Sequence, residues 1–149
     1  MTPLAIDLDA LGDTKPLWNA WLGSVRDVLA IDPEALPADR GAAAVVLDES
    51  GAGNWRSLLE RFSEDHAGAY LRRDAATSAA LRSLAASGVG IGVFTDAPEQ
   101  LAHVALAQLG ATRRVSALES GAGSLDRLRA TLGGDPVVVR TRGDLLSRP

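Results

Sequence analysis

Two carboxylates separated by one residue, Asp7 and Asp9, follow the first apolar run of the chain, "PLAI". The two carboxylates of such a pair can take different roles in a group-transfer reaction, since one can attack while the other moves a proton. Polar residues also follow two later apolar runs: Thr95 and Asp96 come after "VGIGVF", and Arg140 comes after "PVVV". These residue types favour chemistry at a place where three buried segments end.

Each of these side chains also has a purely structural interpretation. Asp7 and Asp9 fit the polar turn after a buried strand, and Asp96 is an expected N-cap for the helix that "DAPE" begins. His66 and His103 fall on helical segments, where histidines more often pack or face solvent than bind ligands. Chemistry is favoured by the convergence of three strand ends rather than by any one residue.

The apolar pattern predicts the elements that position these residues. Short apolar segments predict buried strands at residues 3–6, 89–94 and 136–139, with a further short strand at 113–118. Helical spacing and stop signals predict helices at 16–31, 55–71, 75–87, 97–109 and 124–132. Alternation of apolar strands with helices indicates an α/β chain, with a parallel sheet covered by helices on both faces.

In an open parallel sheet, ligands bind beyond the carboxyl ends of the strands, where the polar residues above would gather. The helical stretch after the first strand leaves the sheet and returns near Leu71. It holds all three tryptophans, which we expect to form the core of this insertion. For Trp18 and Trp21, the alternative is a pocket roof or a homodimer surface.

Composition excludes several classes of function. The 149 residues, 46% of them hydrophobic, fit one compact domain with a real core. The absence of cysteine excludes disulfides, thiolate nucleophiles and Cys-based metal sites, and two histidines leave little for a multi-histidine site. A net charge of −4 with scattered arginines makes nucleic acid an unexpected partner. No leader-like or bilayer-spanning run is present, so we expect a cytoplasmic protein without a membrane partner.

Taken in order, "IDLDAL", "GVFTDAPEQLAHVALAQLGA" and "VVVRTRGDLL" resemble the haloacid dehalogenase (HAD)-like phosphohydrolases, and the resemblance covers essentially the whole chain. It implies a Rossmann-like parallel-sheet core at residues 1–13 and 73–149, with a small helical cap at 14–72 inserted after the first strand. It also implies a magnesium-dependent phosphomonoesterase that acts on a small phosphorylated metabolite through a phosphoaspartyl intermediate.

The resemblance implies a role for each matching residue. Asp7 corresponds to the nucleophile and Asp9 to the general acid and base, while Thr95 corresponds to the hydroxyl that holds the phosphoryl group. Such an attack requires the phosphoryl charge to be neutralised by a metal and positioned donors. The implied sets are Asp7, Asp9 and Asp144 for Mg²⁺, and Thr95, Asp96 and Arg140 for the substrate.

Three stretches depart from the family pattern. "DALGDT" stands where Gly-Thr-Leu usually follows the second aspartate, and the only lysine, Lys15, lies beside this motif. The region where the family has its lysine offers only Arg127 and Arg129. Arg140 and Thr141 stand where an acid is usual, and a fixed positive charge there opposes a dication.

These departures leave two functions open. The chain is either a phosphomonoesterase with atypical motifs, or a catalytically inactive relative that binds a phosphorylated ligand or serves as an interaction module. In the second case Arg140 would replace the metal, by pairing with Asp7 or Asp9 or by receiving an anion. A receiver domain of the flavodoxin or response-regulator type shares the acidic strand ends but has no helical insert after its first strand, and it ranks below both.

Overall fold

Four parallel strands form the centre of the computed structural model, which describes residues 2–148. They are β1 (Leu4–Asp7), β2 (Ile91–Thr95), β3 (Ala117–Ser120) and β4 (Val137–Val139), in the order β3-β2-β1-β4. Ile6 of β1 lies opposite Val93 of β2 and Val139 of β4. The carboxyl ends of β1, β2 and β4 therefore lie at the same edge, as the sequence predicts.

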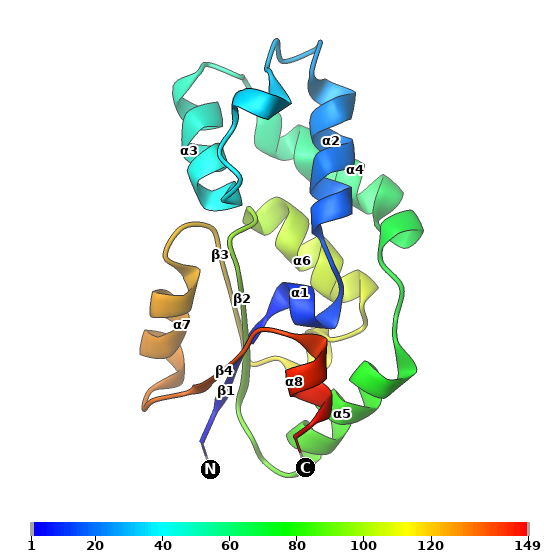
Figure 1. Cartoon of the computed structure of the whole chain (residues 1–149), viewed down its shortest axis with the longest axis vertical. Helices are drawn as coiled ribbons and strands as arrows, with labels where there is room; N and C mark the ends of the chain where they lie inside the picture. Colours follow the sequence, from blue (N-terminus) through cyan, green and yellow to red (C-terminus); the bar gives the residue numbers. More distant parts are fainter. Residues whose placement is uncertain (1, 149) are drawn as a thin grey trace.

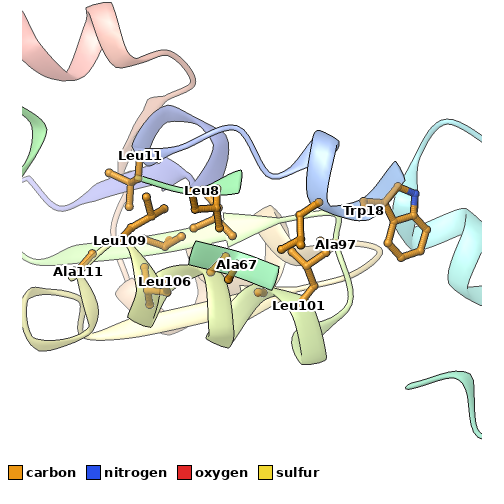
Figure 2. Close-up of a cluster of buried hydrophobic side chains, with 14 of the residues drawn as sticks. Leu8, Leu11, Trp18, Ala67, Ala97, Leu101, Leu106, Leu109 and Ala111 are labelled. Atoms are coloured by element: carbon orange, nitrogen blue, oxygen red, sulfur yellow. The ribbon is translucent and has the colours of Figure 1, made fainter. Parts of the chain in front are cut away.

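Helices cover both faces of the sheet (Figure 1). One face carries α1 (Leu8–Leu11), α5 (Ala75–Ala86), α6 (Glu99–Gln108) and α8 (Arg142–Leu146), and the other carries α7 (Ser124–Leu132). Successive residues of β1 point to opposite faces of the sheet. Ile6 belongs to the large core on one face, whereas Ala5 packs on the other face with Phe94 of β2 and Leu128 of α7. The large core includes leucines of α1 and α6 (Figure 2).

A helical insert lies between α1 and α5 and sits above the sheet in Figure 1. It consists of α2 (Lys15–Val25), a 3₁₀ turn η1 (Pro33–Ala35), α3 (Arg40–Glu49) and α4 (Trp55–Tyr70), and α4 packs against α6. The ring centroids of Trp18 and Trp21 are 5.2 Å apart, and those of Trp21 and Trp55 are 6.0 Å apart. All three rings are buried, which confirms them as core and argues against a tryptophan dimer surface.

The α/β class, the parallel sheet and the insert after β1 are confirmed, but several boundaries differ. The helix predicted at 16–31 ends at Val25, and Val28 is 76% exposed, so the apolar stripe outlasts the helix. The strand predicted at 113–118 begins only at Ala117, because Thr112–Arg114 forms a 3₁₀ turn, η2. α3 and α8 were not predicted as helices.

The helix α3 includes an Ala/Val-rich stretch, residues 42–47, to which the sequence alone assigns neither a strand nor a helix. A short apolar run suits a strand or a helix equally, and its length does not decide between them. Here the side chain of Asp39 accepts the N–H of Ala42 at 2.8 Å and caps the helix. Within residues 2–148, the helices are all too short or too polar to cross a bilayer.

Candidate functional site

A cavity of about 510 Å³ opens at the carboxyl edge of the sheet. It is lined by residues that follow β1, β2 and β4, by the turn between β3 and α7, and by Lys15 and Asp39 of the insert. Five of the six residues predicted for the site line this cavity: Asp7, Asp9, Thr95, Asp96 and Arg140. Asp144 does not line it; it is exposed in the first turn of α8.

Asp7 ends β1 and caps the short helix α1, where its Oδ1 accepts the N–H of Asp9 at 3.0 Å. The side chain is only partly buried, and within residues 2–148 it forms no ion pair. Burial raises the pKa of Asp7, and the charges of Asp9 and Asp96 add to the rise, against the opposing effects of the N–H bond and Lys15. Asp7 is thus a carboxyl group without an ion-pair partner in this part of the chain.

Asp9 has the opposite surroundings. Its Oδ1 accepts the N–H of Thr14 at 3.0 Å and the hydroxyl of Thr14 at 2.6 Å, while its Oδ2 accepts Lys15 Nζ at 2.6 Å. Arg40 Nη2 lies 3.5 Å from Oδ2. Burial alone would raise the pKa of Asp9, but the bonds from Lys15 and Thr14 and the charge of Arg40 lower it overall. Asp9 is therefore held as a carboxylate.

Arg40, the first residue of α3, extends from the insert into this cluster and is only 3% exposed. Its Nε and Nη2 donate to Oδ1 of Asp96 at 3.1 and 2.9 Å, and its backbone N–H donates to Oδ2 at 2.9 Å. Its Nη1 donates to the hydroxyl oxygen of Thr14 at 2.7 Å. A buried guanidinium needs such partners because desolvating an unpaired charge is costly.

The interpretation of Asp96 as an N-cap is therefore wrong. α6 begins at Glu99 with Pro98 as its N-cap residue, and no side chain caps it. Both oxygens of the Asp96 carboxylate instead accept hydrogen bonds from Arg40, 56 residues away in sequence. Asp96 thus joins the sheet to the insert rather than starting its own helix.

Sequence reasoning missed Arg40 and Thr14 and treated Lys15 as misplaced. Lys15 in fact reaches Asp9, because α2 begins directly above the carboxyl end of β1. A signal for Arg40 becomes visible only once α3 is recognised as a helix. A cation in the first turn of a helix opposes the helix dipole, so an arginine placed there calls for a nearby carboxylate. Spacing alone could not have identified that carboxylate as Asp96.

The turn between β3 and α7 forms the opposite wall of the cavity. Gly121 and Gly123 have φ of 79° and 72°, a conformation that favours glycine. Gly123 precedes α7 and no side chain caps this helix. The N–H of Ser124 donates to the carbonyl of Gly121 at 3.3 Å, and the N–H groups of Leu125 and Asp126, which lack helical partners, belong to residues that line the cavity. Arg127 braces the turn by donating to the carbonyls of Ser120 and Ala122.

No known protein family and no curated protein matches the chain by sequence. Among solved structures, the chain is similar to one described as "putative beta-phosphoglucomutase from Thermotoga maritima". The TM-score is 0.59 at 15% identity, and the match covers 94% of this chain and 75% of that one. The chain has a HAD-like fold. At this identity the likeness concerns the fold, and the site must be judged from its own residues.

Within this HAD-like fold, the arginines considered as substitutes for the family lysine are engaged elsewhere. Arg127 pairs with Glu119 at 3.1 Å in addition to bracing the turn, and Arg129 Nη1 lies 3.5 Å from Asp126. Neither lines the cavity. Lys15 and Arg40, which both come from the insert, supply the cationic groups beside the carboxylates.

Arg140 faces the cavity without joining the carboxylates. It is exposed, its Cζ lies 5.5 Å from the centroid of the Phe94 ring, and it forms no ion pair within residues 2–148. The structure therefore contradicts the alternative in which Arg140 pairs with Asp7 or Asp9. Arg142, which follows it closely, pairs instead with Asp74 at 2.7 Å.

The residues implied as magnesium ligands do not fit a magnesium site as arranged here. Mg²⁺ takes oxygen ligands, usually one or two carboxylates with waters and a substrate phosphate. Asp144 lies outside the cavity, and both oxygens of Asp9 are occupied by Thr14, Lys15 and Arg40. In the described chain, no group of three His, Cys, Asp or Glu side chains is placed to hold a metal ion.

Proposed function

We propose that this HAD-like protein binds a small phosphorylated molecule in the cavity at the sheet edge without hydrolysing it. The observation that carries the proposal is the capture of Asp9 by Thr14, Lys15 and Arg40. A general acid must carry a proton that it can give to the leaving oxygen, and efficient acids have a pKa near the working pH. These bonds lower the pKa of Asp9, so the group in the acid's position stays ionised.

Loss of this proton transfer would remove about 10²- to 10⁴-fold of rate acceleration. The charge stabilisation that a metal gives to a transferring phosphoryl group would add a further large factor. Both weaknesses arise from the arrangement of the donors: Asp9 is paired with cations, and Asp144 lies away from the cavity. Binding without turnover therefore fits the geometry better than phosphate ester hydrolysis.

Three features of the cavity suit a phosphate group. Arg140 offers a guanidinium without a carboxylate partner in the described chain, and guanidinium groups bind phosphate in bidentate fashion. The Thr95 oxygen accepts the N–H of Ala97 at 3.2 Å, which leaves its O–H free to donate. The uncapped first turn of α7 adds backbone N–H groups and the positive end of a helix dipole.

The protonation of Asp7 should make anion binding depend on pH. As a carboxylate it would repel a phosphate, but its raised pKa makes the neutral acid more accessible. A protonated Asp7 could donate a hydrogen bond to a phosphate oxygen. The charges of Asp9 and Asp96 are already balanced by Lys15 and Arg40. We therefore expect anions to bind more tightly as the pH falls toward the pKa of Asp7.

A magnesium-dependent phosphomonoesterase is the second candidate. It is favoured by Asp7, whose carboxyl group lines the cavity together with Thr95 and forms no ion pair within residues 2–148. In that case Asp7 would be the nucleophile and Thr95 would hold the phosphoryl group. This candidate ranks second because the carboxylates present do not fit the metal that it needs.

One set of measurements separates the candidates. The purified chain is assayed with Mg²⁺ against an aryl phosphate and a panel of sugar and nucleotide phosphates, and binding of the same panel is followed calorimetrically. We expect saturable binding without turnover, and about tenfold weaker binding for Arg140→Gln, which removes charge-assisted hydrogen bonds. The matched control is Arg82→Gln on the exposed side of α5, which should change the dissociation constant less than twofold.

Turnover that disappears in Asp7→Asn would establish the second candidate instead. If no phosphorylated molecule of the panel binds, or if Arg82→Gln weakens binding as much as Arg140→Gln does, the proposed ligand class is wrong.

A further inference from the structure

A second cavity, of about 390 Å³, lies at the end of α6 that is remote from the carboxylates. We call it the basic cavity and define it by its lining residues, which are Arg73, Ala107, Gly110, Thr112, Arg113 and Arg114. Three of the six carry a guanidinium group and none carries a carboxylate. Such a concentration of positive charge is unusual in a chain whose net charge is −4.

The basic cavity brings together residues that are far apart in sequence. The pair Arg113 and Arg114 belongs to the 3₁₀ turn η2, and taken alone it is an ordinary solvated pair. Arg73 comes from the segment that leads from α4 back to α5, about 40 residues earlier. The fold therefore places a third guanidinium against a pair that the sequence shows in isolation.

Arg73 is held in place by its surroundings. Its Nε donates to the carbonyl of Gln108 at 3.3 Å, and its guanidinium lies against Gly110, where an added Cβ would be 2.9 Å from Arg73 Cζ. Gly110 has φ of 72°, so glycine suits both the turn and the close approach of the Arg73 guanidinium. Within residues 2–148, Arg73 Nη1 and Nη2 have no hydrogen-bond partner, which leaves them free for a ligand.

The neighbouring carboxylate does not neutralise this cluster. Asp74 follows Arg73 directly, but it caps α5 through Thr77 and pairs with Arg142 at 2.7 Å. Arg113 and Arg114 form no ion pair in the described chain. Three guanidinium groups that share one concave surface repel each other, and an anion seated between them relieves that repulsion.

We propose that the basic cavity is a second ligand site, which binds a small soluble anion carrying two adjacent phosphate groups. A guanidinium fork matches two phosphate oxygens, and three guanidinium charges around one cavity are balanced better by two adjacent phosphate groups than by the charge of about −1.5 to −2 on one. The hydroxyl of Thr112 supplies a neutral donor beside them. This site is independent of the function proposed for the cavity at the sheet edge.

The test follows the backbone amide resonances of the full-length protein while inorganic pyrophosphate is added at 0.1 M salt. We expect saturable shifts at Gly110, Thr112 and Arg113, and about tenfold weaker binding for Arg73→Gln. Arg72→Gln is the matched control, because it removes the same charge from an exposed neighbour that does not line the cavity. It should change the dissociation constant less than twofold.

Three results would overturn this proposal. The first is equal weakening by Arg72→Gln and Arg73→Gln, which would indicate attraction by overall charge. The second is that malonate binds as tightly as pyrophosphate, which would remove the phosphate assignment. The third is that shifts are confined to Gly121 and Gly123, which report the sheet-edge cavity, or do not saturate. Each of these results would leave the function proposed for the sheet-edge cavity unaffected.

Discussion

Asp7 and Asp9 are two residues apart and have opposite electrostatic settings. Burial raises the pKa of Asp7, whereas hydrogen bonds from Lys15 and Thr14 lower the pKa of Asp9 in spite of its burial. In a HAD-like fold, the position expected to attack thus carries the more easily protonated group, and the position expected to donate a proton carries a fixed charge. This inversion argues for an anion-binding role over a catalytic one.

The two aspartates should affect stability with opposite signs. A raised pKa means that the folded state binds more protons, so the stability contributed by Asp7 falls as the pH rises through its folded-state pKa. Asp7→Asn should therefore increase the free energy of unfolding at pH 7, and the gain should shrink toward pH 4. Urea denaturation at several pH values measures both effects. A loss of stability at pH 7 would contradict the setting described for Asp7.

Asp9 should behave in the reverse manner. Its lowered pKa contributes stability that is present at neutral pH and is lost as the pH falls through its folded-state pKa. Asp9→Asn should cost about 1–3 kcal/mol at pH 7, because charge-assisted bonds from Lys15 and Arg40 are weakened. The cost should diminish in acid. The same denaturation series tests it, and a pH-independent cost would mean that packing rather than charge is involved.

At the scale of elements, α3 approaches the core closely at Gly41. A Cβ added to Gly41 would lie 2.6 Å from the backbone nitrogen of Ala122, in the turn before α7. The missing side chain therefore lets α3 rest on the turn that forms one wall of the sheet-edge cavity. Because the opposing atom belongs to the backbone of Ala122, it cannot move aside as the end of a flexible side chain could.

Two glycine-to-alanine substitutions within helices should consequently have opposite effects. Gly41→Ala should destabilise the protein by about 1–3 kcal/mol, since a methyl group is forced into packed backbone. Gly23→Ala in α2 is the matched control, with no atom within 4 Å of the added Cβ, and should stabilise by about 0.5–1 kcal/mol. Thermal denaturation measures both, and similar changes in the two variants would contradict the close contact.

Element type and order could largely be predicted from the sequence, whereas long-range pairing could not. β1 and α7 were predicted within a residue of their observed bounds because apolar runs and glycine stops are local signals. The end of α2 was wrong because Val28 continues the stripe although nothing covers it. The pairing of Asp96 with Arg40 depends on how the insert folds back onto the sheet, which no local pattern encodes.

At the scale of the whole molecule, the insert and the sheet are joined by apolar packing and by a buried polar cluster. α4 packs against α6, and Arg40 bonds to Asp96 and Thr14 below α3. The division into a core at residues 1–13 and 73–149 and an insert at 14–72 stays a prediction. The joint between the two parts gives a means of testing whether they unfold together.

The three tryptophans all lie in the insert, so their fluorescence reports on the insert while far-ultraviolet circular dichroism reports on the whole chain. The wild-type transitions should coincide. Arg40→Leu should lower stability by about 1–3 kcal/mol, since it removes the charge-assisted hydrogen bonds to Asp96, whose side chain is partly exposed, and the fluorescence transition should then come first. Arg129→Gln, in an exposed pair with Asp126 within α7, is the control and should cost less than about 1 kcal/mol. Coincident transitions in Arg40→Leu would mean that packing alone joins the parts.

The Arg40 contact also has a kinetic consequence. It connects positions 56 residues apart, and it can form only after both the helical insert and the carboxyl end of β2 have taken their final shape. We expect a contact that needs both parts in place to form after the folding transition state, so that its loss changes the unfolding rate rather than the folding rate. We therefore expect the Arg40 guanidinium to slow unfolding, and so to set the lifetime of the folded state.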